Sequence, residues 1–162
     1  MEQGAGLLSW LHASSVAGAM RSSTWMYPVV EIVHIVGFSV LVGAVAMFDL
    51  RVLGCARALP VDGLARILLP WSLASLVLIV PAGLLMFAAQ PLALAASGVF
   101  QLKLLLIGLA GANAACFHLG VYRSVAAWNT RSRAPALAQV QSAFSLLLWV
   151  AVISCGRLLA YL

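Results

Sequence analysis

Four long apolar runs are the feature that most constrains how this chain can fold. A helix needs about 20 mainly apolar residues to cross the hydrocarbon core of a bilayer. Inside a bilayer every backbone polar group must be satisfied internally, and these runs lack the alternating pattern of barrel strands. The sequence therefore predicts an all-α fold, an integral membrane four-helix bundle. The predicted spans are Tyr27 to Phe48, Leu68 to Ala89, Val99 to Gly120, and Val140 to Tyr161.

The composition supports a membrane environment. Of the 162 residues, 64% are hydrophobic and 8% are charged, whereas soluble domains are about half apolar and about a quarter charged. The charged residues do not mark a linker, so we expect one transmembrane domain over residues 1–162. The net charge of +5 is not gathered into a basic stripe with exposed aromatic residues, which argues against nucleic acid. The lipid bilayer is the expected partner.

Basic residues set the expected orientation. They concentrate after the first and third runs, and by the positive-inside rule those two segments are cytoplasmic. An even number of spans then leaves both termini on the outer side. We expect a multi-pass protein of a bacterial cytoplasmic (inner) membrane with periplasmic N- and C-termini. The basic residues concerned are Arg51, Arg57, Arg66, Arg123, Arg131 and Arg133.

The segment 1–24 precedes the first run. It lacks the basic start of a signal peptide, so we expect it to be retained. Its hydrophobic residues are followed by small and polar ones, which predicts a short N-terminal helix lying in the outer interface. Trp10, Trp25 and Tyr27 would then lie at the depth of the headgroups.

Ionisable residues inside spans are costly and usually face the interior of a helix bundle. At about 1.5 Å per residue, His34 lies about 10 Å below the outer end of its helix, with Glu31 one turn above it on the same face. Lys103 and Arg157 reach a similar outer level on the third and fourth helices. We call Glu31, His34, Lys103 and Arg157 the outer group, and we expect them to converge.

His118 belongs to a different depth. It follows Lys103 by 15 residues, which places it about 22 Å lower, near Asp49, Arg51 and Arg123. We call these four residues the inner group. Because the two histidines differ in depth by about 20 Å, His34 and His118 are not expected to bind one haem from opposite sides.

Small residues predict where helices approach closely. They include Gly37 and Gly43 on the first span and Gly108 and Gly111 on the third. We interpret them as packing positions. Pro81 in the second span predicts a kink.

The run from Tyr27 to His34, continued by Gly37, Gly43 and Asp49 to Gly54, resembles an uncharacterised family of small bacterial inner-membrane proteins catalogued as a domain of unknown function. The third run, with Phe100, Lys103, Asn113 and His118, resembles the corresponding helix of that family. The similarity extends over most of the chain from Trp25 onward. The family's name carries no function.

A histidine early in the first helix and a lysine opening an apolar helix also resemble HemJ-type protoporphyrinogen oxidases, which are haem-b membrane proteins, and CopD-type copper-resistance proteins. The first resemblance implies that His34 is a haem ligand and Lys103 a functional partner. The rest of the HemJ signature around the first loop is absent from this sequence, so the resemblance does not carry the oxidase activity over.

The first functional hypothesis is a haem-b protein that transfers electrons within the membrane. Imidazole is a common axial ligand of haem iron, and cationic groups can pair with the propionates. His34 would bind the metal, Lys103 and Arg157 would meet the propionates, and His12 or Met86 could be the second axial ligand. In the competing interpretation, His34 simply hydrogen-bonds Glu31 or Lys103. His118 could bind a second haem, but an interfacial role is preferred.

Two other hypotheses stay open. Copper or other ion handling would follow the CopD likeness, but Cu(I) favours thioether and thiolate ligands, and the methionines are scattered in depth. A non-catalytic anchor or accessory subunit would need no chemistry from either group. Other membrane redox subunits or a quinone are conceivable partners, as is a second copy of the chain. Whether the protein is an enzyme stays open.

Overall fold

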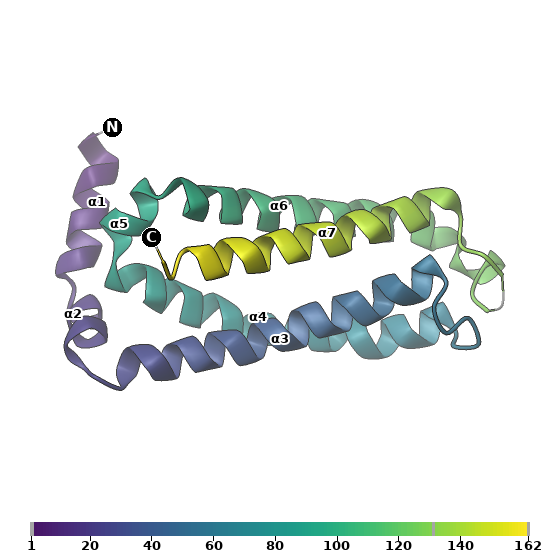
Figure 1. Ribbon diagram of the computed structural model, residues 1–162, viewed down its shortest axis with the longest axis horizontal. Coiled ribbons are helices and arrows are strands. Elements are labelled where there is room, and N and C mark those ends of the chain that lie inside the picture. Colours follow the sequence, from purple (N-terminus) through teal and green to yellow (C-terminus); the bar gives the residue numbers. More distant parts are fainter. Residues whose placement is uncertain (1, 131, 162) are drawn as a thin grey trace. The chain divides into compact units, whose positions relative to one another are not determined.

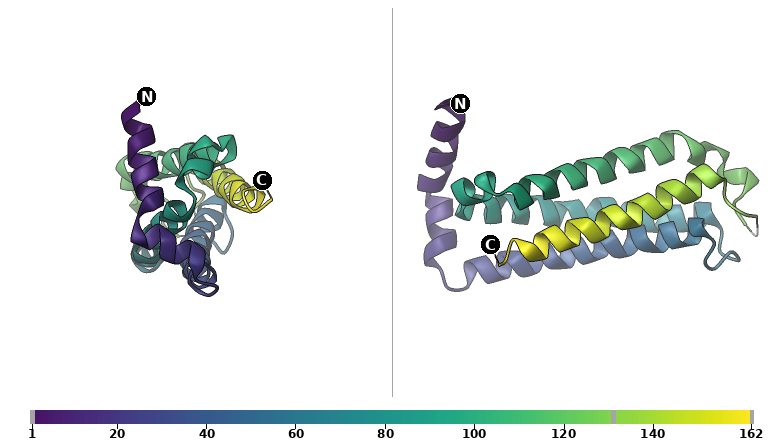
Figure 2. Two further views of the ribbon diagram at one scale, coloured as in Figure 1. Left: turned by 90° about the vertical axis from the view of Figure 1, so that its left-hand side faces the viewer. Right: turned by 45° about the horizontal axis from the view of Figure 1, so that its top comes forward.

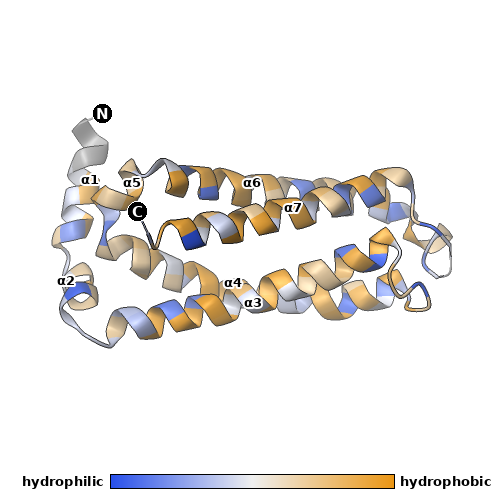
Figure 3. Cartoon of the chain, viewed as in Figure 1, coloured by the Kyte–Doolittle hydropathy of each residue, from blue (hydrophilic) through white to orange (hydrophobic). Residues whose placement is uncertain are grey.

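The computed structural model describes residues 2–130 and 132–161, with side chains from residue 6 onward. Four of its helices are long and apolar enough to cross a membrane (Figure 1): α3 (Met26–Leu53), α4 (Val61–Ala89), α6 (Gly98–Leu119) and α7 (Ala136–Leu158). Hydrophobic residues predominate along all four (Figure 3). No strand occurs among the described residues. The predicted all-α class is therefore confirmed, and the chain is a small multi-pass membrane protein.

The remaining elements are short. They are α1 (Glu2–Ala13), α2 (Ser15–Ser22), α5 (Pro91–Ala96) and the 3-10 helix η1 (Val121–Ala127). The single N-terminal helix that the sequence predicts is divided into α1 and α2 at Ser14. The Ser14 hydroxyl donates to the carbonyl of Leu11 at 2.7 Å and accepts from the amide of Ala17 at 3.2 Å. Ser14 thus ends one helix and caps the next. The interfacial position of this segment stays a prediction.

The chain divides into two compact units. Unit 1 comprises Met1–Leu41 and Leu73–Gly98, and unit 2 comprises Val42–Ser72 and Val99–Leu162. Both α3 and α4 therefore contribute to each unit. In unit 1, α1 packs against α2 and α5 (Figure 2).

Unit 2 is itself a bundle, because it contains parts of all four long helices. The Phe48 and Phe117 rings join α3 to α6 in an edge-on contact with their centroids 5.6 Å apart. The Asn113 side chain joins α6 to α7 by donating to the carbonyl of Gln141 at 3.0 Å. The buried core consists of Phe48, Val52, Val61, Ala65, Phe117, Trp128, Ala134 and Ala138.

The end of α3 lies beyond the predicted span, which stops at Phe48. Gly54 has a positive φ of 114°, and its amide donates to the carbonyl of Arg51 at 3.1 Å. The amide of Cys55 donates to the carbonyl of Leu50 at 2.9 Å. This pair of bonds is a Schellman motif, which favours glycine at the left-handed position. Asp49 and Arg51 therefore belong to the end of α3 and not to a loop.

The start of α4 also differs from the prediction, by seven residues, since the helix begins at Val61 and not at Leu68. Asn129 caps it from a distant part of unit 2. The Asn129 carbonyl accepts from the amide of Val61 at 3.1 Å, and its side-chain oxygen accepts from the amide of Asp62 at 3.0 Å. These bonds satisfy amides that a helix start leaves without an intrahelical partner.

Candidate functional site

His34 lies on α3 and packs against the backbone of α4 within unit 1. Its Nδ1 atom is 3.0 Å from the carbonyl oxygen of Ile79. Because a carbonyl oxygen only accepts, the contact requires a proton on Nδ1. In neutral imidazole the lone pair is then on Nε2. The partner of Nδ1 is thus a backbone carbonyl of α4.

Gly83 gives the imidazole ring its space. A Cβ atom added at Gly83 would lie 3.2 Å from Cε1 and 3.5 Å from Nδ1 of His34. The Phe38 ring is nearly parallel to the imidazole, with an interplanar angle of 15° and ring centroids 6.4 Å apart. His34 is half-buried. Its ring is therefore held by a backbone acceptor, a glycine and an aromatic neighbour.

Gly37 brings α3 close to α4 one turn after His34. An added Cβ atom there would lie 2.9 Å from Ile79 Cγ1 and 3.2 Å from the carbonyl oxygen of Ser75. The prediction that Gly37 allows close approach is confirmed. It is wrong for Gly43, Gly108 and Gly111. Apart from the neighbouring residues and the helix's own backbone, no described atom lies within 4 Å of a Cβ added at these positions.

The other unit 1 residues that the sequence singled out lie near the start of α3, near the end of α4, and on α1. Glu31 is exposed one turn before His34. Met86 is half-buried, three residues after Gly83 and thus near the same face of α4. His12 is exposed on α1, where Arg21 donates to its carbonyl at 2.8 Å and to the carbonyl of Ala89 on α4 at 3.1 Å. His12 is thereby tied to the end of α4.

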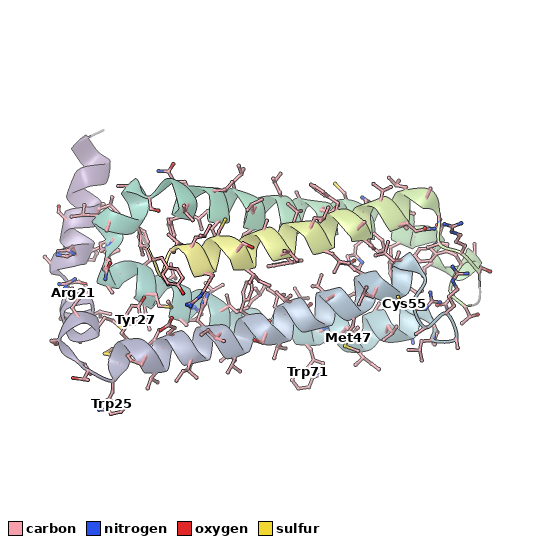
Figure 4. The ribbon with its side chains drawn as sticks, viewed as in Figure 1. Arg21, Trp25, Tyr27, Met47, Cys55 and Trp71 are labelled. Carbon is pink, nitrogen blue, oxygen red and sulfur yellow. The ribbon has the colours of Figure 1, made fainter. Side chains whose placement is uncertain are left out.

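A cavity of about 350 Å³ lies at the start of α3. Its polar lining comes from α2, from the turn after it, from the start of α3 and from the residue between α4 and α5. The polar lining residues are Arg21, Ser23, Thr24, Tyr27 and Gln90, of which Figure 4 labels Arg21 and Tyr27. Trp25, in the same turn, is 77% exposed and points away from the helices (Figure 4). Tyr27 precedes His34 by seven residues, about 10 Å along the helix.

Lys103 and Arg157 lie in unit 2. The Lys103 Nζ atom is 3.7 Å from the position of an added Cβ at Gly156, the residue before Arg157. The Arg157 guanidinium lies over the Tyr161 ring, 4.7 Å from its centroid, and donates to the Tyr161 hydroxyl. The two cationic residues therefore occupy the same level of α6 and α7. Since His34 and Glu31 belong to unit 1, the convergence of the whole outer group stays a prediction.

His118 sits among aromatic rings at the end of α6. Its ring centroid is 5.0 Å from that of Tyr122, 5.3 Å from Phe117 and 6.1 Å from Phe48. The contact with Phe48 places His118 at the level of α3 that Asp49 also occupies. Burial, and secondarily the Asp62 carboxylate, raise the pKa of the Tyr122 phenol above its ordinary value. This packing favours the interfacial role for His118.

Arg51 is 3% exposed at the end of α3 and binds backbone carbonyls. Its Nε atom donates to the carbonyl of Leu59 at 2.6 Å. Its Nη2 atom donates to the carbonyls of Arg57 at 3.2 Å and Asn129 at 3.0 Å. Arg51 thus fixes the first loop through backbone carbonyls. The predicted alternative is a salt bridge between Arg51 and Asp49. No such ion pair is seen among the described residues, where Asp49 Oδ2 has no hydrogen-bond partner.

Two features of these sites have no strong sequence signal. The Ile79 carbonyl is a backbone group, and Asn129 acts across 67 positions of the chain.

Among the described residues, no three His, Cys, Asp or Glu side chains gather to hold a metal ion. A haem iron needs only one or two protein ligands. The residues around His34 are compatible with such a group, because the Ile79 carbonyl and Gly83 already fix the imidazole.

Comparison with known proteins adds no relative: no family model matches the chain, and no curated protein or solved structure matches it either.

Proposed function

We propose that this protein binds haem b through His34 and transfers electrons within a bacterial inner membrane. The observation that carries the proposal is the contact between His34 Nδ1 and the Ile79 carbonyl. Metal-binding histidines commonly donate their other ring N–H to a carbonyl or carboxylate, which fixes the tautomer and the orientation of the ring. Here the same contact assigns the lone pair to Nε2, the atom that would ligate the iron.

Haem b supplies one-electron redox chemistry when it is bound. The chain's own residues would hold and enclose the group. His34 would ligate the iron, Ile79 would orient the imidazole, and Phe38 would cover one side of that ring. Met86 and His12, both in unit 1, are the candidate second ligands. Lys103 and Arg157 remain the cations that the sequence predicts for the propionates.

Absorption spectra of the purified protein, oxidised and then reduced, test the proposal. Cells would be grown with ample haem supply. We expect haem-b bands in the wild type and their loss in His34→Ala, with helix content and elution volume unchanged. His118→Ala is the matched control, because its ring is packed among aromatic side chains, and it should keep the bands.

Two results would contradict the proposal. A wild-type protein without any haem band would favour an anchor or accessory role, and metal analysis of that sample would test the copper alternative. Loss of the bands in His118→Ala with retention in His34→Ala would move the cofactor to the inner group.

A further inference from the structure

Asp49 is a buried acidic residue that the haem hypothesis does not use. It lies on α3, four residues before the helix ends at Leu53, and is 5% exposed. Its polar neighbours are the hydroxyl groups of Ser142 and Ser145, which interact with its carboxyl group from α7. These serines are three positions apart and share one face of α7. All three residues belong to unit 2, where the end of α3 lies beside α7 (Figure 2).

Two oxygens of this cluster lack regular hydrogen bonds. Asp49 Oδ2 and Ser142 Oγ are both buried, and neither has a partner of regular geometry within the described part of the chain. Ser142 is 1% exposed, so bulk water does not reach its side chain freely. An ionised carboxylate only accepts hydrogen bonds, and an uncompensated buried one is costly. An ionised Asp49 carboxylate at this position would therefore need a positively charged partner or a proton.

No basic side chain supplies that charge among the described residues. On α3, the nearby Arg51 is directed at the carbonyls of the loop. On α6, His118 packs among aromatic rings. On α4, Ala65 and Leu69 pack in the neighbouring hydrophobic core, and both are apolar. On α7, the groups that face Asp49 are the two serine hydroxyls.

We propose that Asp49, Ser142 and Ser145 form a reversible proton-binding site. A hydronium ion at the C-terminal end of α3 would transfer its proton to the Asp49 carboxylate and leave as water. The new Oδ2–H group would donate to Ser142 Oγ, and the Ser145 hydroxyl would donate to the other carboxyl oxygen. One proton thus satisfies both oxygens that lack partners. The inference does not depend on haem binding.

A proton suits this site better than a metal ion does. Hard divalent cations take about six or more oxygen ligands. The cluster offers the Asp49 carboxyl group and two hydroxyls, and helical backbone carbonyls at this level are engaged within their own helices. A proton needs one oxygen and one acceptor. The site lies about 6 Å along the helix from the end of α3, a short distance for exchange with water.

Infrared difference spectra of the protein in lipid nanodiscs, recorded between alkaline and acid pH, test the proposal. We expect the C=O stretch of a protonated carboxyl group to appear on acidification and to shift in deuterated water. The band should be lost in Asp49→Asn and should shift in Ser142→Ala. Asp62→Asn is the matched control, and it should keep the Asp49 band.

Several outcomes would overturn the proposal. In the first, the wild-type pH series contains no band that disappears in Asp49→Asn. In the second, the band is present at every pH. In the third, sodium chloride suppresses the band and choline chloride does not. The last result would indicate a cation site. If Asp49→Asn does not fold, the band's shift in Ser142→Ala, against no shift in Ser154→Ala, decides the assignment. Ser154 is exposed on α7 and donates to the carbonyl of Val150.

Discussion

The Nδ1 atom of His34 on α3 lies 3.0 Å from the carbonyl oxygen of Ile79 on α4. This bond links the two helices that unit 1 shares with unit 2, and it fixes the tautomer of the imidazole. A role in holding a cofactor and a role in joining helices are both compatible with the bond. The two roles differ in what they predict when the His34 imidazole is displaced but kept. Haem affinity should fall if His34 holds the cofactor, and it should not change if His34 only joins the helices.

Gly83→Ala displaces the ring without changing its chemistry. The new methyl group would lie 3.2 Å from Cε1 of His34, closer than an ordinary contact. Since outer-shell changes commonly cost 10–100-fold in metal affinity, we expect haem affinity to fall by about tenfold. Titration of the haem-free protein with haem, followed by absorbance, measures the change.

The control for this substitution is Gly108→Ala on α6, where the added Cβ meets no described atom within 4 Å beyond the neighbouring residues and the helix's own backbone. It should bind haem as the wild type does. An unchanged haem affinity in Gly83→Ala would indicate that His34 serves only to join α3 and α4.

Gly37→Ala is expected to destabilise the protein. The added Cβ would lie 2.9 Å from Ile79 Cγ1 and 3.2 Å from the Ser75 carbonyl oxygen, and this backbone atom cannot rotate away. Overpacking of this kind costs about 1–3 kcal/mol. Denaturant unfolding in detergent micelles measures the loss. In Gly43→Ala, on the same helix, the added Cβ meets no described atom within 4 Å beyond the neighbouring residues and the helix's own backbone, so stability should be kept or raised. Equal effects of the two substitutions would contradict the close approach.

The helices could be predicted from the sequence, because a long apolar run has few alternatives in a bilayer. Their ends could not all be predicted. The span prediction stopped α3 at Phe48 because Asp49 and Arg51 are charged. In the structure both are buried within α3, so they do not mark its end. The start of α4 depends on Asn129, whose distant contact leaves no local pattern around Val61.

The candidate site was predicted only in part for a similar reason. His34 stands out as an ionisable residue in an apolar run, and the structure gives it a defined partner. That partner is a backbone carbonyl, which any residue at position 79 would present. Ser142 and Ser145 were missed because serine changes the hydropathy of a helix only slightly. Their proximity to Asp49 results from how α3 and α7 pack, which the sequence pattern does not specify.

The membrane orientation can be tested with reporter fusions. The basic residues around the α3–α4 connection and in the segment after α6 predict that both termini lie on the outer side. Alkaline phosphatase fused after residue 162 should therefore be active, and a cytoplasmic fluorescent protein fused at the same point should not fluoresce. Fusions within the segment after α3 should show the opposite pattern. An inactive C-terminal phosphatase with an active cytoplasmic reporter there would reverse the orientation.

Asn129→Ala is expected to loosen the start of α4. The substitution removes the side-chain oxygen that accepts from the amide of Asp62 at 3.0 Å, while the backbone carbonyl that Arg51 and Val61 contact is retained. Loss of a capping side chain costs about 1 kcal/mol. Hydrogen exchange should therefore speed up over the first turn of α4, with a small fall in unfolding free energy. Thr130→Ala, at an exposed neighbouring position, is the control and should leave both quantities unchanged. Unaltered exchange at the start of α4 in Asn129→Ala would show that the helix does not need this distant cap.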